Sequence, residues 1–231
     1  MAVVHPRVAV RRGAARATRW WGKAWVRAVE EAAYAEQDLA AARSLSRSGR
    51  VGGITTEPGG FVAAVEDDHG LWTVSGTVPV LDETAIEALV ETVAAESGRV
   101  AALLAGDLPH SLVEHAEEAG VELLPYGGEL GATCTCEAWV DPCAHALAVL
   151  HQLAWLVDAD PFVLLQLRGL PRDDLLARLH ARESAGQVVA QGDPDGHDGG
   201  HDVETGLDAA LRAARVLELA DDPDSPVGHL F

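Results

Sequence analysis

All three cysteines of this chain fall within ten residues, and a histidine follows them closely. Cys134, Cys136, Cys143 and His145 have the spacing C-x-C-x6-C-x-H. On an extended segment, residues i and i+2 point to one face, so the first two thiolates can lie side by side. Six intervening residues allow a turn that brings the second pair back opposite the first. Four nitrogen and sulfur ligands form a closed tetrahedral shell, and the spacing therefore predicts one structural Zn²⁺.

Two other interpretations of the cysteine cluster stay open at this point. The cysteines could be small buried hydrophobic residues beside an incidental histidine. A redox C-x-C pair is a further alternative, but it leaves Cys143 and His145 unexplained. An odd number of closely spaced cysteines does not fit a disulfide framework, so we expect a reducing, cytoplasmic compartment. The occurrence of every cysteine of the chain in one cluster favours the metal site.

The segment after the first two cysteines predicts a helix that begins beside the metal. Asp141 is suited to an N-cap and Pro142 to the first helical residue of a buried helix that ends near Val157. The free N–H groups at its start would stabilise thiolates. This start would place Cys143 and His145 about 200° apart around the helix axis. The helix therefore either begins later or has a distorted first turn.

The pattern resembles the SWIM zinc finger, whose signature is C-x-C, a variable gap and C-x-H. Flanking segments are also similar to bacterial SWIM zinc-finger family proteins, and the resemblance covers roughly residues 18–183. The similar segments are Trp20–Trp25, Arg47–Val51, Trp139–Pro142, Asp158–Phe162 and the leucine-rich run to Gly169. The resemblance implies zinc binding and contacts with protein or DNA partners. For bacterial members it also implies an association with Swi/Snf-type helicase ATPases.

The charge divides unevenly along the chain. Residues 1–50 carry a balance of +6, whereas residues 51–231 carry −25. An acidic surface repels phosphate backbones, so we expect DNA binding by the protein alone to be weak. The sequence contains no apolar run of 18 residues and no apolar stretch behind Arg11-Arg12, so we expect neither a membrane span nor a signal peptide.

One basic, tryptophan-rich stretch is suited to contact nucleic acid or a partner, because aromatic rings are interleaved with cations. Its candidate contact residues are Arg16, Arg19, Trp20, Lys23 and Arg27. The alternative is that the tryptophans form the core face of a helix and the cations its solvated flank. We favour this alternative.

The fold class that these patterns predict is α+β. We expect a small antiparallel meander of three strands, several helices, and a Cys3His zinc finger that leads into a buried helix. The predicted strands are residues 49–56, 60–66 and 71–80, and the predicted helices are 18–33, 36–45, 83–96, 99–105, 109–119, 142–157, 161–168, 171–183 and 206–219. The predicted regions are a basic tail or edge strand at 1–17, an α+β domain at 18–130, the finger and following helices at 131–183, and an acidic flexible region at 184–231.

An enzymatic interpretation rests on His115-Ala116-Glu117 followed by Pro142-Cys143, which has part of the zinc deaminase signature. The last cysteine of that signature is Ala146 here, so we expect no enzyme and no small-molecule substrate. Other polar residues have simpler explanations. We expect the Asp67-Asp68 doublet to be a solvated turn and His151 to be a packing residue. We expect Trp139 and Trp155 to pack near the metal.

Overall fold

The computed structural model describes residues 1–11 and 17–190, and residues Met1–Arg182 of these belong to one compact unit. The second unit, Glu183–Phe231, is described as far as Ala190. Within the described residues the elements run β1 (Val3–His5), α1 (Trp20–Ala32), α2 (Glu36–Arg47), β2 (Val51–Glu57), β3 (Gly60–Glu66), β4 (Leu71–Thr77), α3 (Glu83–Ala94), α4 (Ser97–Leu104), α5 (His110–Glu118), a 3₁₀ turn η1 (Gly127–Glu129), β5 (Gly131–Cys134), α6 (Ala144–Ala159), α7 (Pro161–Leu167) and α8 (Arg172–Ala190). The predicted α+β class is confirmed.

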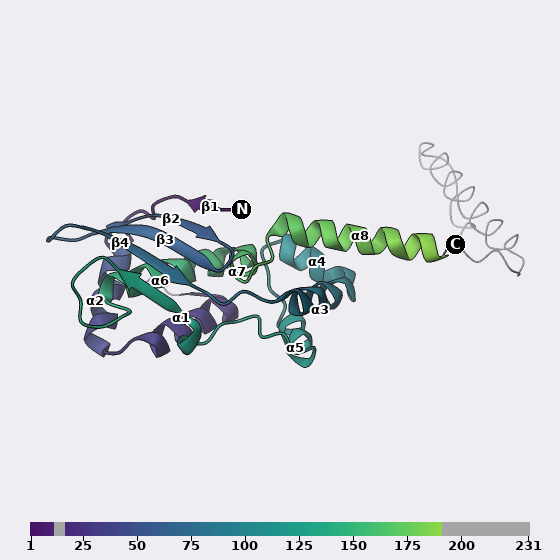
Figure 1. Cartoon of the computed structure of the whole chain (residues 1–231), viewed down its shortest axis with the longest axis horizontal. Helices are drawn as coiled ribbons and strands as arrows, with labels where there is room; N and C mark the ends of the chain where they lie inside the picture. Colours follow the sequence, from purple (N-terminus) through teal and green to yellow (C-terminus); the bar gives the residue numbers. More distant parts are fainter. Residues whose placement is uncertain (12–16, 191–231) are drawn as a thin grey trace, which may run out of the picture. The chain divides into compact units, whose positions relative to one another are not determined.

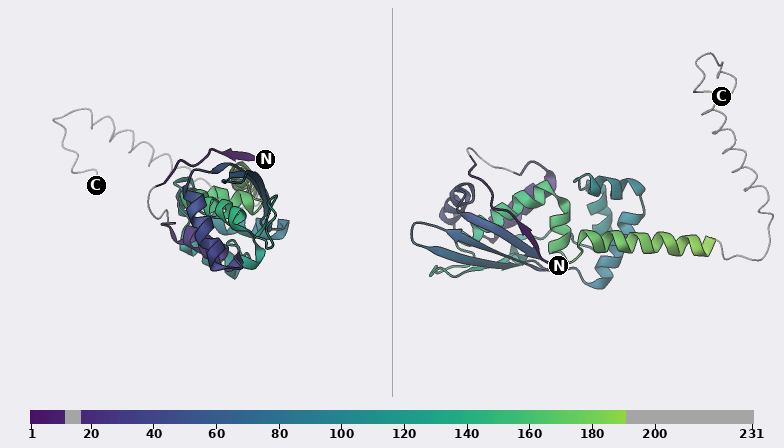
Figure 2. Two further views of the ribbon diagram at one scale, coloured as in Figure 1. Left: turned by 90° about the vertical axis from the view of Figure 1, so that its left-hand side faces the viewer. Right: turned by 90° about the horizontal axis from the view of Figure 1, so that it is seen from above.

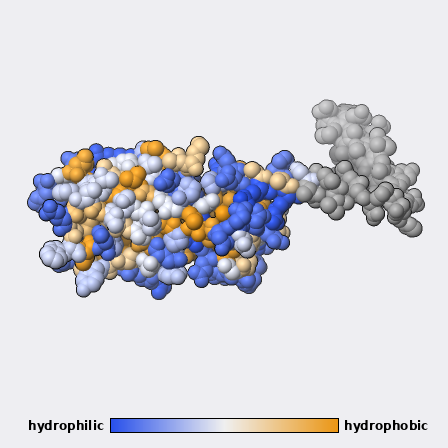
Figure 3. Space-filling model, viewed as in Figure 1, coloured by the Kyte–Doolittle hydropathy of each residue, from blue (hydrophilic) through white to orange (hydrophobic). Residues whose placement is uncertain are grey.

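The strands form one antiparallel sheet in the order β1-β2-β3-β4-β5. Burial alternates along β3, where Phe61, Ala63 and Val65 are buried and the residues between them are exposed. This alternation means that one face of the sheet meets the core and the other meets solvent. Helices α1, α2 and α6 lie on the covered side (Figures 1 and 2). On the face drawn in Figure 3, hydrophobic residues gather in small groups that hydrophilic residues separate.

The sheet is larger than the predicted three-stranded meander. The three predicted strands are β2, β3 and β4, and β1 and β5 add one strand at each edge. Both added strands are short and pair with partners far away in sequence, so their alternation gives little signal of its own. Strand β5 belongs to the predicted finger region 131–183, but it pairs with β4 of the predicted domain 18–130. The two predicted regions thus share one sheet.

Helix α6 is the central helix of the core, and residues Ala146–Trp155 along it are all buried. Helix α1 is fixed to it through two tryptophans. Trp21 Nε1 donates to the Val157 carbonyl at 2.8 Å, and Trp25 Nε1 donates to the Leu150 carbonyl at 3.3 Å. Both indole rings are buried, and each N–H group has a hydrogen-bond acceptor on α6. These tryptophans are therefore core residues of the α1–α6 interface.

The start of α1 differs from that of the predicted helix 18–33. The helix begins at Trp20, and Arg19 occupies the N-cap position without a side-chain cap. The carboxylate of Asp158, at the end of α6, accepts from the backbone N–H groups of Thr18 at 3.0 Å and Arg19 at 2.8 Å. A Cβ on Gly22 would lie 2.3 Å from Oδ1 of Asp158, so the glycine gives this carboxylate room. A distant side chain therefore caps α1, which local sequence could not indicate.

The remaining helices follow the predicted order with shifted ends. Asp82 caps α3, because its Oδ1 accepts from Ala85 N–H at 2.8 Å. Helix α8 continues to Ala190, so the prediction that the flexible linker begins at Ser184 is wrong. The rest of that linker and the predicted helix 206–219 lie outside the described residues. No helix among residues 1–11 and 17–190 is long and apolar enough to cross a membrane.

Candidate metal centre

The four residues predicted as ligands come together at one point. One donor atom each from Cys134, Cys136, Cys143 and His145 lies within 4.8 Å of the other three. The Sγ atoms of Cys136 and Cys143 are 3.5 Å apart, and His145 Nδ1 lies 3.9 Å from Cys134 Sγ and 4.0 Å from Cys143 Sγ. A tetrahedral shell with Zn–S bonds of about 2.3 Å puts two sulfur atoms about 3.8 Å apart. The cluster therefore fits a zinc ion in both its donor types and its size.

The sheet positions the first pair of cysteines. Cys134 is the last residue of β5 and pairs with Val74 of β4. The pairing continues beyond the strand, because Thr135 N–H donates to the Thr73 carbonyl at 3.0 Å. Gly76 allows this edge to form, since a Cβ there would lie 2.1 Å from the Phe61 ring and 2.6 Å from the Gly131 carbonyl oxygen. A regular strand edge thus fixes where the first thiol lies.

The start of α6 positions the second pair. The helix begins at Ala144 with Cys143 in extended conformation at the N-cap position, and the Asp141–Pro142 peptide bond is cis. The prediction of Asp141 as N-cap and Pro142 as first helical residue is therefore wrong. Of the two alternatives for the conflict in spacing, the later helix start is correct. With Cys143 outside the helix, its side chain is free to point toward that of His145.

His145 is held from its other ring nitrogen by Asp67, which lies 78 residues earlier in the turn between β3 and β4. His145 Nε2 is 3.1 Å from Asp67 Oδ2. The other oxygen, Oδ1, accepts from His69 N–H at 2.8 Å, Gly70 N–H at 2.9 Å and Trp72 Nε1 at 3.0 Å. Metal-binding histidines commonly donate their second N–H to a carboxylate. This arrangement leaves Nδ1 as the nitrogen that faces the three sulfurs.

The electrostatics of Asp67 agree with a permanently charged carboxylate. Partial burial acts to raise its pKa. The hydrogen bonds from His69, Trp72, Gly70 and His145 outweigh this effect and lower the pKa to about 2. Asp67 is therefore negative at neutral pH and holds the proton of His145 on Nε2. The solvated turn predicted for the Asp67-Asp68 doublet is wrong for Asp67.

The thiols themselves need a cation to ionise together. Burial, followed by a side-chain hydrogen bond with Cys136 and the charges of Cys143 and Cys136, raises the pKa of Cys134 to about 12, although the backbone N–H of Cys136 opposes this rise. Burial also raises the pKa of Cys143, although the N–H groups of Ala146 and His145 partly oppose it. The pKa of Cys136 is lowered, because its hydrogen bond with His145 and its neighbouring donors outweigh burial. A divalent metal would stabilise all three thiolates at once, which is the usual chemistry of such a site.

The aromatic residue beside the metal ligands is not one of the two that the sequence indicated. The Trp72 ring lies 6.0 Å from the His145 ring, at an interplanar angle of 32°. Trp139, in the loop between the two ligand pairs, is 102% exposed. Trp155 is buried on α6 beneath the Arg11 guanidinium, 4.6 Å from its ring centroid. The prediction that Trp139 packs near the metal is therefore wrong, and no local spacing could have identified Trp72.

The candidate nucleic-acid contacts on α1 are mostly engaged within the protein. Arg19 Nη1 donates to the Gly106 carbonyl at 2.7 Å, and Trp20 Nε1 donates to the Leu108 carbonyl at 3.0 Å. Arg27 forms an ion pair with Glu31 at 2.8 Å. Lys23 lines a cavity between α1 and α2, and Arg16 lies outside the described residues. The contacts support the favoured interpretation of a core face with solvated flanks.

The deaminase residues do not join the metal cluster. His115 Nδ1 lies 2.6 Å from the Ser111 carbonyl oxygen and 2.7 Å from Arg99 Nη2. The metal-type cluster found among the described residues contains neither His115 nor Glu117.

Comparison with known proteins agrees with this geometry. Residues 119–154 match the family model of the SWIM zinc finger, so the resemblance predicted from the cysteine motif is confirmed for this segment. A relative from Mycobacterium tuberculosis, "Uncharacterized protein Rv2102", is 29% identical over 176 residues, which cover 75% of this chain and 63% of the relative. No solved structure matches the chain.

Proposed function

We propose that this protein is a non-enzymatic zinc-finger module that binds one structural Zn²⁺ and docks onto a protein partner. Cys134 Sγ, Cys136 Sγ, Cys143 Sγ and His145 Nδ1 would be the four ligands. The observation that carries the zinc assignment is the closed Cys3His cluster with its Asp67 support. Because protein atoms fill all four positions, no coordination position is left for a reactive water.

The docking function is supported by the loop between the two ligand pairs. Trp139 is fully exposed at its tip, and Glu137, Ala138 and Asp141 around it are exposed as well. An indole in water forgoes a large burial energy, and tryptophan is enriched among residues that dominate binding energy at protein interfaces. The match to the SWIM zinc finger supports this proposal, because the family resemblance implies contacts with protein or DNA partners. The acidic residues beside Trp139 favour a protein over DNA as its partner.

The resemblance to bacterial SWIM proteins makes a Swi/Snf-type helicase ATPase the first partner to test. The zinc-loaded chain is mixed with a purified ATPase of this class from the same organism, and binding is measured by interferometry. We expect Trp139→Ser to weaken binding at least about tenfold, as removal of an interface anchor does. Tyr34→Ser is the matched control, because Tyr34 is an 83% exposed aromatic outside the finger. Equal binding by wild type and Trp139→Ser would contradict docking through this loop.

A further inference from the structure

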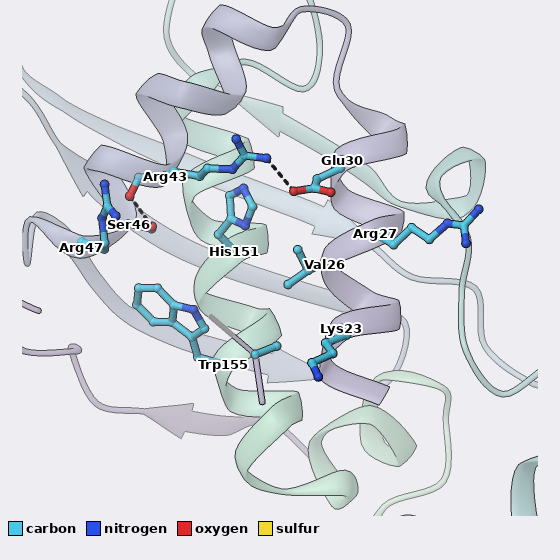
Figure 4. Close-up of a pocket in the computed structure, with 10 residues that line it drawn as sticks. Lys23, Val26, Arg27, Glu30, Arg43, Ser46, Arg47, His151 and Trp155 are labelled. Atoms are coloured by element: carbon cyan, nitrogen blue, oxygen red, sulfur yellow. Dashed lines mark hydrogen bonds and ion pairs between the residues drawn. The ribbon is translucent and has the colours of Figure 1, made fainter. Parts of the chain in front are cut away.

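A concave region lies over the middle of α6, between α1 and α2 (Figure 4). It is a cavity of about 520 Å³. Cavities of about 300–1,000 Å³ are typical of small-molecule sites. Helix α6 supplies His151 and Trp155 to the floor, while α1 and α2 form the two walls. The zinc ligands do not line this cavity, so it is a separate feature of the molecule.

The walls of the cavity are positively charged in a protein whose net charge is −19. Lys23 and Arg27 line it from α1, and Arg43 and Arg47 line it from α2. Glu30 is the acidic residue among the lining side chains, and it pairs with Arg43 across the two helices at 2.6 Å. Among the residues that the structure describes, the Lys23 ammonium group has no ion-pair partner. Arg27 pairs with Glu31 outside the cavity, but Lys23, Arg43 and Arg47 still outnumber Glu30 in the lining, and this excess of positive charge attracts an anion.

The floor supplies an independent indication of a ligand. His151 is only 6% exposed, and within the described residues its Nε2 atom makes no hydrogen bond. A buried polar atom without a hydrogen-bond partner destabilises the folded state, so native structures seldom keep one without a reason. Burial and the nearby Arg43 lower the pKa of His151 to about 4, and Glu30 opposes this only weakly. The ring is therefore neutral at pH 7 and can donate or accept one hydrogen bond from the cavity.

The aromatic residue on the floor suits a flat group. Trp155 lies one helical turn after His151 and lines the same cavity. The Arg11 guanidinium covers one face of its ring, so a ligand would meet the remaining surface of the indole. Indole rings stack with planar ligands such as nucleobases. Arginine guanidinium groups recognise phosphate through paired hydrogen bonds, and lysine adds a point charge.

We propose that this cavity is a binding site for a small organic phosphate that carries a planar ring, with Lys23, Arg43 and Arg47 around the phosphate and His151 as a polar contact on the floor. Trp155 packs against the ring of the ligand. The site is independent of the zinc site and of the docking loop.

The first experiment is isothermal titration of the zinc-loaded full chain with AMP, pyrophosphate and adenosine. AMP and pyrophosphate should bind, and adenosine, which lacks the phosphate, should bind at least about tenfold more weakly than AMP. Lys23→Gln and Arg47→Gln should each weaken AMP binding about tenfold. Arg182→Gln is the matched control, because this arginine pairs with Glu87 outside the cavity, and it should leave binding unchanged. Absence of saturable binding of AMP and pyrophosphate up to about 1 mM would overturn the proposal.

A second variant separates a ligand contact from a packing role. His151→Leu removes an unsatisfied polar group from a buried position, so the melting temperature without ligand should stay the same or rise. The same variant should weaken AMP binding about fivefold or more, because the hydrogen bond of the neutral ring is lost. Full AMP affinity in His151→Leu would overturn the assignment of His151 to the site.

Discussion

His145 and His151 lie on the same helix, six residues apart, and their surroundings differ. His145 has partners at both ring nitrogens, the sulfur cluster at Nδ1 and Asp67 at Nε2. His151 is more deeply buried, yet its Nε2 has no partner within the described residues. The comparison teaches that burial alone does not distinguish a structural histidine from a binding one. The hydrogen-bond partners of each nitrogen do.

The largest effect should come from removing a zinc ligand. Cys136→Ser and His145→Ala remove a zinc ligand, and binding of structural zinc contributes of order 10 kcal/mol, comparable to the stability of a whole domain. Both variants should lose zinc and melt at least the 131–168 region, as seen by circular dichroism and metal analysis. His110→Ala, which changes a histidine exposed on α5, is the control. Wild-type stability of Cys136→Ser would contradict the assignment.

The next effect should appear in the pH dependence of stability and comes from His151. Its pKa is about 4 in the folded chain against an ordinary value of 6.5. As the pH falls, His151 takes up a proton in the unfolded chain before it does so in the folded chain. The free energy of unfolding therefore has its full value above pH 6.5 and decreases as the pH falls toward 4. The size is of order 3 kcal/mol. Urea titrations of the zinc-loaded wild type and of His151→Leu measure the free energy of unfolding at each pH. This free energy should depend less on pH in the variant. Zinc release at low pH affects both proteins and does not contribute to the difference. Parallel slopes would be inconsistent with a neutral His151.

A smaller effect should follow from loosening the support of His145. Asp67→Asn keeps the shape of the side chain but removes the charge that holds the proton on Nε2. Loss of such a carboxylate typically lowers metal affinity 10–100-fold, about 1.4–2.7 kcal/mol. Competition with a zinc chelator measures the change. Asp68→Asn, next to it but paired with Arg50 at the surface, should leave the affinity unchanged.

The smallest expected signal is binding of bare duplex DNA. Phosphate contacts supply most non-specific affinity, and residues 51–231 carry −25. Arg19 and Arg27 of the basic stretch are already engaged in internal contacts. Fluorescence anisotropy at physiological salt should show weak or no binding, with a shallow salt dependence. Submicromolar binding with a steep salt slope would make DNA the leading partner.

The sequence predicted the part of the site that is local in the chain. The four ligands lie within twelve residues, so their spacing alone indicated a shared ion, and the strand and helix that hold them were predicted in outline. Asp67 and Trp72 could not be predicted, because only the pairing of β3, β4 and β5 brings them beside His145. Spacing carries no information about partners supplied by a distant hairpin.

The tryptophans show that sequence spacing predicts burial in a helix but not in an irregular loop. The helical spacing of Trp21 and Trp25 correctly indicated a core face, because one helix determines which side chains share a side. Trp139 lies in an irregular loop where no period applies, and the expectation that a large apolar ring is buried was wrong there. His151 was expected to be a packing residue. The basic side chains of α1 and α2 that surround it could not be predicted, because only the tertiary structure brings these helices together over α6.

Zinc X-ray absorption spectroscopy on the purified chain, combined with metal quantification, tests the Cys3His zinc site itself. We expect one zinc per chain with three sulfur neighbours at about 2.3 Å and one nitrogen neighbour at about 2.0 Å. The protein without zinc, or a shell in which water oxygen replaces one of the four side chains, would contradict it.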